Sequence, residues 1–182
     1  KQLRDKGWSV ANNCIRLEHI LPGATDTLVI FITGGSTSDL GLNPQNWPIR
    51  LSERLKAKNM SFIIYNGAVG AYGTGQELLK LIRDGLPLQP AIHISYSGAN
   101  EYQNPYFVSP YEQTFFNRSL FNGQTSRVLP NTIYLLKDLF HLNRQQLVLK
   151  DYPTSNGLEN WKNNLAVMEA LADGNGYAFL GI

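Results

Sequence analysis

Four short runs of apolar and β-branched residues recur along the chain. They cover residues 27–33, 61–65, 91–96 and 177–181. The first run is apolar without alternation, which is typical of a strand that is buried on both faces of a sheet. A glycine follows each of the first three runs within two residues, as expected where a strand passes into a turn. The pattern therefore predicts four buried strands.

Segments with helical periodicity separate these strands. Residues 47–58, 76–84 and 158–172 each place apolar side chains three and four positions apart, with polar residues between them. Gly85 and Pro87 are expected to end the second segment. Strands that alternate with helices form right-handed βαβ units in a parallel sheet. We therefore predict an α/β fold in which helices flank a mostly parallel sheet.

The stretch at residues 101–155 interrupts this alternation. It contains no clear strand, and it is rich in aromatic residues between positions 102 and 140. The helical pattern of residues 132–143 favours an insertion with a small core of its own. Residues 102–116 directly follow the third strand, where a wall of a functional site is an equally good interpretation. Because no repeat or linker is evident elsewhere, residues 1–182 are predicted to form one domain that carries this insertion.

The composition excludes several classes of function. The 182 residues include 16 Lys and Arg against 14 Asp and Glu, so a net charge of +2 leaves no basic excess for general binding of nucleic acid. No apolar run approaches the roughly 20 residues that span a bilayer. The single cysteine, Cys14, excludes an internal disulfide, and three histidines offer little for a metal site. We expect neither a metal nor an organic cofactor.

Residues that could take part in binding or catalysis lie where the first three predicted strands end. Gly34, Gly35 and Ser36 follow the first strand, a glycine-rich loop with Gly70 follows the second, and Asn100 follows the third. In open parallel sheets, ligands bind outside the carboxyl ends of the strands. We therefore expect these three segments to contribute to a single site.

Ser36 is the candidate nucleophile of this site. The glycine pair before it permits a sharp turn that presents a serine where free backbone N–H groups point outward. Such N–H groups, and a side-chain amide like that of Asn100, can bind a developing oxyanion. Each residue alone also has a structural explanation. Ser36 could cap a helix or turn, and Asn100 could be satisfied within a turn.

A nucleotide site is a weaker interpretation of the glycine-rich loop. The phosphate-binding Walker pattern needs Lys and then Ser or Thr after its last glycine, whereas Gln76 and Glu77 follow Gly75. The spacing of the glycines does not fit the dinucleotide pattern either.

Together the three segments resemble the first three sequence blocks of the SGNH, or GDSL-like, hydrolases. The Gly-Asp-Ser block of that family corresponds to Gly-Gly-Ser, which ends here at Ser36. Its Asn-x-Gly-x-x-Gly block has an altered counterpart from Asn66 to Gly70. Its Gly-x-Asn-Asp block corresponds to Gly-Ala-Asn-Glu, which ends at Glu101. The resemblance covers residues 27–101, and the later helix and strand also fit.

The resemblance implies a flavodoxin-like three-layer sandwich and a serine esterase without cofactor. It implies Ser36 as the nucleophile, with the oxyanion held by the backbone N–H groups of Ser36 and Gly70 and by the side chain of Asn100. A gapless alignment of the second block places Ala71 at the glycine of the family, so Ala71 is the alternative to Gly70. The expected substrate is a carbohydrate ester or a small ester. The alternatives are O-acyl transfer to a sugar hydroxyl and a non-catalytic binding module on the same fold.

The base that would activate the serine is not evident. In this family an Asp-x-x-His block follows the last strand, whereas the chain ends on its last predicted strand at Ile182. We expect the natural protein to continue with this block, which makes residues 1–182 a domain that lacks its C-terminal element. The alternative is that the fold persists without a complete triad.

The histidines within the chain are poor candidates for that base. The literal match from Asp138 to His141 lies on a helical pattern ahead of residues 158–172, where helix surface is the better explanation. His93 is internal to a predicted buried strand, so we expect a packed core histidine. No role is predicted for His19.

Overall fold

A mixed sheet forms the centre of the protein. The structure is a computed structural model, and it describes residues 9–100 and 155–182. Within these residues, six strands form one sheet in the order β1-β2-β4-β3-β5-β6. Its four parallel strands are those that the apolar runs predict, namely β3 (Leu28–Gly34), β4 (Phe62–Asn66), β5 (Ile92–Tyr96) and β6 (Ala178–Gly181).

The hairpin at one edge of the sheet is not predicted from the sequence. β1 (Ser9–Ala11) and β2 (Cys14–His19) pair antiparallel, and β2 also pairs antiparallel with β4. Asn12 and Asn13 form the turn at φ values of 50° and 57°. Positive φ at both central residues is typical of the type I′ turn, which suits a two-residue hairpin loop. β2 lacks an apolar run because charged residues occupy part of it.

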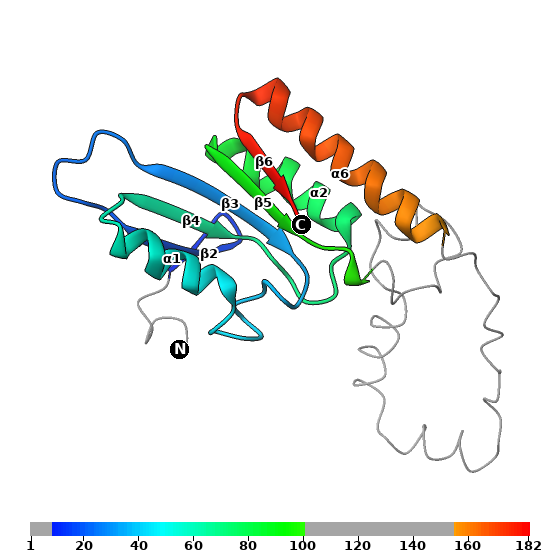
Figure 1. Cartoon of the computed structure of the whole chain (residues 1–182), viewed down its shortest axis with the longest axis horizontal. Coiled ribbons are helices and arrows are strands. Elements are labelled where there is room, and N and C mark those ends of the chain that lie inside the picture. The colour runs from blue at the N-terminus through cyan, green and yellow to red at the C-terminus, as the bar shows by residue number, and fades with distance from the viewer. Residues whose placement is uncertain (1–8, 101–154) are drawn as a thin grey trace, which may run out of the picture.

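Helices cover both faces of the sheet (Figure 1). α1 (Trp47–Ala57) lies on one face, and α2 (Thr74–Lys80) and α6 (Ser155–Asn175) lie together on the other. α2 continues into the π-helical turn η2 (Leu81–Gly85) and the 3₁₀ turn η3 (Leu86–Leu88). This arrangement confirms an α/β architecture with helices on both sides of the sheet.

Each face of the sheet has a core of its own. On the α1 side, Ile30 and Ile32 of β3 are buried together with apolar residues of neighbouring strands. On the α2 and α6 side, Phe31 of β3 is buried with Leu81 and Met168. Successive side chains of a strand point to opposite faces, so the unbroken apolar run of β3 fills both cores.

The predictions for the insertion, a site wall at residues 102–116 and a helix at residues 132–143, stay predictions. Residues 101–154, which include the predicted helix at 132–143 as well as Asp138 and His141, lie outside the described residues. None of the helices in the described ranges combines the length and apolar character that crossing a membrane requires.

Truncation of Phe31 is expected to destabilise the fold strongly. The side chain is fully buried, and a Cβ on Gly85 would lie 2.6 Å from its ring, so little space surrounds it. Removing a buried aromatic ring leaves a cavity as well as losing burial. We expect Phe31→Ala to lower the free energy of unfolding by about 3–5 kcal/mol in urea titrations. Leu79→Ala on α2 is the control, because Leu79 is 51% exposed and its loss should cost less than about 1 kcal/mol. Similar losses in the two variants would contradict this packing.

Candidate active site

Three loops meet beyond the carboxyl ends of β3, β4 and β5. A Cβ built on Gly35, after β3, would lie 2.5 Å from Nδ2 of Asn100, after β5. The same Cβ would lie 3.4 Å from the carbonyl oxygen of Tyr72, after β4. The three segments that the sequence groups together are therefore neighbours in space. We call the region around Ser36, Gly70 and Asn100 the strand-end site.

Ser36 lies in an exposed turn directly after β3. Its carbonyl oxygen accepts a hydrogen bond from Nδ2 of Asn46 at 3.1 Å, and the same amide group donates to the carbonyl oxygen of Asp39. These bonds fix the backbone of the turn while Ser36 itself stays accessible. The next helix, α1, begins only at Trp47, so Ser36 does not cap it.

The neighbouring Ser38 has a structural role instead. Its side chain is buried, and its Oγ accepts a hydrogen bond from Nε1 of Trp47 at 2.9 Å. Gly34 makes room for it, because a Cβ there would lie 2.7 Å from Oγ of Ser38. Gly34 also has a φ of +152°, a backbone conformation that favours glycine. Of the two serines in this turn, only Ser36 is exposed.

Asn66 at the end of β4 links two of the loops through hydrogen bonds. Its Nδ2 donates to the carbonyl oxygen of Ser38 at 2.8 Å, and its Oδ1 accepts from the N–H of Ala68 at 3.0 Å. Asn66 is only 3% exposed. The asparagine of the second sequence block therefore positions the loops and does not face a ligand.

The backbone N–H of Gly70 already has a partner. It donates to Oδ2 of Asp39 at 2.8 Å, while Oδ1 of Asp39 accepts from the N–H groups of Gly41 and Leu42. The Asp39 carboxylate thus bridges the loop after β3 and the loop after β4. An oxyanion could use the Gly70 N–H only after this bond opens. No local pattern in the sequence predicts this role of Asp39, because the bond joins residues that are 31 positions apart.

Ala71 has a strained backbone next to Gly70. Its φ is +67°, in the left-handed region that costs an L-residue about 1–2 kcal/mol. Glycine adopts this conformation without that cost. The gapless alignment places the family's glycine at this position, and the positive φ gives a physical reason for a glycine there.

The side chain of Asn100 crosses from one loop to another. Its Nδ2 donates to the carbonyl oxygen of Tyr72 at 2.6 Å. A side-chain amide carries two N–H groups, and this bond uses one of them. The alternative prediction is that the amide of Asn100 forms its hydrogen bond within its own turn. The structure differs, because the bonded carbonyl belongs to Tyr72, 28 residues away.

His93 is a core histidine, as predicted from its position within a strand. It is fully buried, its Nε2 lies 3.0 Å from Oγ1 of Thr33, and its ring packs against Phe31 and Phe179. Burial disfavours the charged ring and lowers the pKa of His93 to about 3. The ring therefore stays neutral inside the core.

His19 lies at the opposite end of the sheet from Ser36. It is the last residue of β2 and pairs with Phe62, the first residue of β4, whereas Ser36 follows the carboxyl end of β3. Neither of the two described histidines is therefore placed to act on Ser36. The described ranges also hold no cluster of three or more His, Cys, Asp or Glu that could bind a metal ion.

A buried carboxylate lies behind the site on α2. Glu77 is fully buried, and its Oε2 accepts a hydrogen bond from Oγ of Ser95 at 2.7 Å. Ser95 Oγ lies 3.3 Å from Oγ of Ser97, which in turn accepts from Nε1 of Trp161. The network ties α2, β5 and α6 together beneath the strand-end site. Its only signal in the sequence is a glutamate within the helical pattern after Gly75.

The chain is similar to solved structures, whereas two comparisons by sequence find no match. No family model and no curated protein sequence matches it. Solved structures that are similar to it include the acetyl xylan esterase AlAXEase, at 12% identity and a TM-score of 0.44 over 85% of this chain and 77% of that one. Axe2, an acetylxylan esterase from Geobacillus stearothermophilus, has 12% identity and a TM-score of 0.43 over 84% and 74%. TesA has 16% identity and a TM-score of 0.42 over 83% and 76%.

Proposed function

We propose that this protein is a serine-dependent ester hydrolase that forms an acyl-enzyme on Ser36. The observation that carries the proposal is the meeting of three loops around one exposed serine. Gly35 leaves space for the Asn100 amide beside the Ser36 turn, and Tyr72 holds that amide in place. A nucleophile next to fixed N–H donors is the arrangement that acyl transfer requires.

The reaction would proceed in two steps at this serine. Oγ of Ser36 attacks the ester carbonyl, and the electron pair of the C=O bond moves onto the oxygen to form an oxyanion. The intermediate collapses, expels the alcohol and leaves the acyl group on Ser36. Water then attacks the acyl-enzyme and releases the acid. The proton of Ser36 passes to a general base, which neither of the two described histidines supplies.

The oxyanion would be held by three donors. They are the backbone N–H of Ser36, the backbone N–H of Gly70 and the side-chain amide of Asn100. Ala71 is the alternative second donor, which the Asp39 bond to Gly70 supports. Each such donor is worth about 3 kcal/mol of transition-state stabilisation. No metal or organic cofactor takes part in this mechanism.

The proposed substrate is a carbohydrate ester or a small ester. A sugar hydroxyl that replaces water in the second step would make the protein an O-acyltransferase instead. One observation favours a second candidate function, a non-catalytic binding module. Both described histidines, His19 and His93, are placed away from Ser36.

Turnover of a simple ester separates these functions. The full chain is incubated with 4-nitrophenyl acetate, with and without a sugar acceptor, and both free acetate and acetylated sugar are quantified. A hydrolase releases acetate at the rate of nitrophenol release. An acetylated sugar in place of acetate would indicate a transferase. No release above the buffer rate would contradict both enzymatic functions.

Adding a methyl group at Gly35 should impair the proposed oxyanion site. The new Cβ of Gly35→Ala would lie 2.5 Å from Nδ2 of Asn100, so the amide must leave its bond to Tyr72. We expect kcat to fall by up to about 10²-fold, with a smaller change in KM, because the amide acts on the transition state. Gly174→Ala on α6 is the control, since a Cβ there meets nothing within 4 Å. Equal kcat values for the two variants would argue against Asn100 as a donor.

A further inference from the structure

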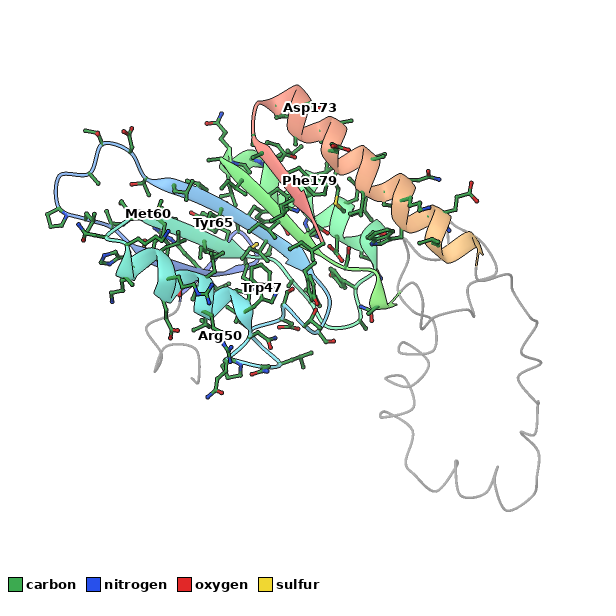
Figure 2. All side chains as sticks on the ribbon, in the orientation of Figure 1. Trp47, Arg50, Met60, Tyr65, Asp173 and Phe179 are labelled. Carbon is green, nitrogen blue, oxygen red and sulfur yellow. The ribbon has the colours of Figure 1, made fainter. Side chains whose placement is uncertain are left out.

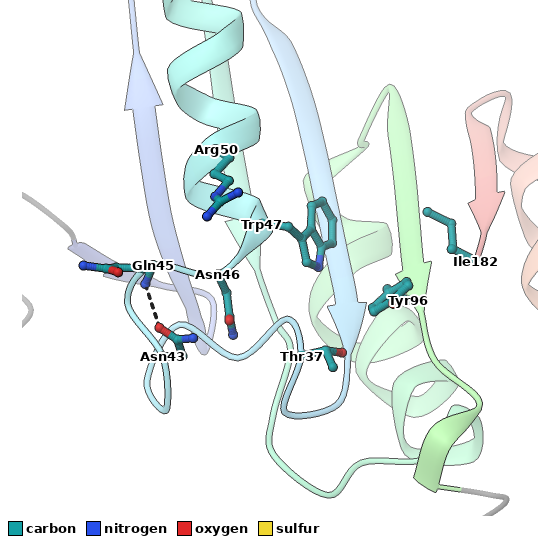
Figure 3. Close-up of a pocket in the computed structure, with 8 residues that line it drawn as sticks. All are labelled: Thr37, Asn43, Gln45, Asn46, Trp47, Arg50, Tyr96 and Ile182. Atoms are coloured by element: carbon teal, nitrogen blue, oxygen red, sulfur yellow. Dashed lines mark hydrogen bonds between the residues drawn. The ribbon is translucent and has the colours of Figure 1, made fainter.

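A surface cavity of about 600 Å³ adjoins the Ser36 turn (Figure 3). Thr37, which directly follows Ser36, forms part of its wall. Asn46 lines the cavity and also donates to the carbonyl oxygen of Ser36, so the cavity and the proposed nucleophile share one polar framework. Trp47 and Arg50 contribute to the cavity from α1 (Figure 3). A cavity of this size accommodates a small organic ligand.

Two aromatic rings and Ile182 form the apolar part of the cavity. Trp47 and Tyr96 meet edge to face, with ring centroids 6.4 Å apart. The indole is held in place, because its Nε1 donates to Oγ of the buried Ser38 at 2.9 Å. Rings whose orientation is fixed in this way offer apolar contact without a further loss of side-chain freedom on binding. They suit a flat ring or the apolar face of a sugar.

Arg50 gives the cavity its charge. Among the described residues that line it, Arg50 is the only one with a charged side chain, and the polar remainder consists of amides and a hydroxyl. Arg50 is exposed, and no ion pair of Arg50 occurs among the described residues. Within residues 9–100 and 155–182, the guanidinium therefore has no carboxylate partner to displace. A planar guanidinium matches a carboxylate with two parallel hydrogen bonds.

We propose that this cavity binds the alcohol part of an ester that carries a carboxylate, with Arg50 as the specificity-determining residue. The inference rests on the proposed ester hydrolysis at Ser36. The alcohol part is the better occupant, because the cavity is far larger than an acetyl group. A single guanidinium among amides matches the single charge of a carboxylate. Trp47 and Tyr96 contact the ring that bears this carboxylate, and Arg50 selects for its charge.

Paired esters test this assignment. The ratio of kcat/KM for 4-acetoxybenzoate to that for its neutral methyl ester is measured with the full chain, with Arg50→Ala and with Arg54→Ala. Arg54 is an exposed arginine on the same helix that does not line the cavity. We expect the wild type and Arg54→Ala to share a ratio about tenfold above that of Arg50→Ala. An equal ratio in all three proteins would overturn the assignment, while hydrolysis of the neutral ester would still support the proposed function.

A binding measurement keeps the test independent of turnover. 4-Acetamidobenzoate has the same carboxylate but an amide in place of the ester, and its affinity is measured by titration calorimetry. We expect Arg50→Ala to weaken binding at least tenfold relative to the wild type and Arg54→Ala. If neither ester is hydrolysed but this difference is found, the proposed function fails and the carboxylate site stands. Equal or undetectable affinity in all three proteins overturns the site.

Discussion

Replacement of Ser36 by alanine is expected to abolish ester turnover. We expect kcat/KM of the full chain toward 4-nitrophenyl acetate to fall by at least about three orders of magnitude, because loss of the nucleophile in serine hydrolases costs up to about 10⁶-fold. Without Oγ no acyl-enzyme can form, and only the oxyanion donors and substrate binding remain. The fold should tolerate the change, since Ser36 is exposed. Initial rates and thermal unfolding, measured on the same preparation, separate the two effects.

A second serine provides the matched control for this variant. Ser52 lies on α1, where its hydroxyl donates to the carbonyl oxygen of Ile49 at 2.7 Å. This bond lies within α1 and involves no residue of the strand-end site, so Ser52→Ala should retain the wild-type rate. More than a tenth of the wild-type activity in Ser36→Ala would exclude Ser36 as the nucleophile.

Removal of the Asp84 carboxylate should cause one of the largest losses of stability. Asp84 Oδ2 lies 2.7 Å from Nζ of Lys80, and both side chains are buried. Lys80 also donates to the carbonyl oxygen of Asn13 in the hairpin turn, while Asn13 Nδ2 donates to Asp84. Asp84→Ala leaves the buried ammonium without its counter-ion. We expect a loss of about 3–5 kcal/mol in the free energy of unfolding at pH 7, measured in urea.

The same variant should reveal a dependence on pH. A hydrogen bond from Arg83, together with bonds from Lys80 and Asn13, holds the pKa of Asp84 well below its usual range. A lowered pKa in the folded state stabilises the protein above the pKa of the unfolded chain, which is about 3.9. This stabilisation is lost as the pH falls through that value toward the folded pKa. The stability difference between the wild type and Asp84→Ala should therefore shrink below about pH 4.

An exposed aspartate serves as the control for the buried one. Asp173 lies on the solvent side of α6 (Figure 2), and Asp173→Ala should change stability by less than about 0.5 kcal/mol. A difference between the wild type and Asp84→Ala that is equally large at pH 7 and pH 3 would contradict the role assigned to this carboxylate.

The parallel part of the sheet is predictable because burial on both faces leaves an unbroken apolar run. β3 is the clearest case, with Phe31 in one core and Ile32 in the other. β2 is not predicted from the sequence, because it lies next to the sheet edge and Arg16 and Glu18 interrupt its apolar pattern. The predicted helix at 76–84 is divided in the structure, because α2 passes into a π-helical turn before Gly85.

The outline of the site is also predictable, whereas its hydrogen bonds are not. The carboxyl ends of parallel strands meet at one edge of a sheet, so the proximity of the segments after β3, β4 and β5 follows from the parallel pairing of these strands. The partners that occupy these groups come from loops distant in sequence. The bond between Asp39 and Gly70 and the bond between Asn100 and Tyr72 depend on loop geometry that no local pattern encodes.

Covalent labelling tests the central claim most directly. The full chain is treated with a fluorophosphonate, which reacts with activated serines, and the adduct is mapped by mass spectrometry of its peptides. We predict one adduct per chain, located on Ser36 and absent from Ser36→Ala. An adduct on another residue, or ester turnover by a protein that takes no label, would contradict the proposal that Ser36 is the nucleophile.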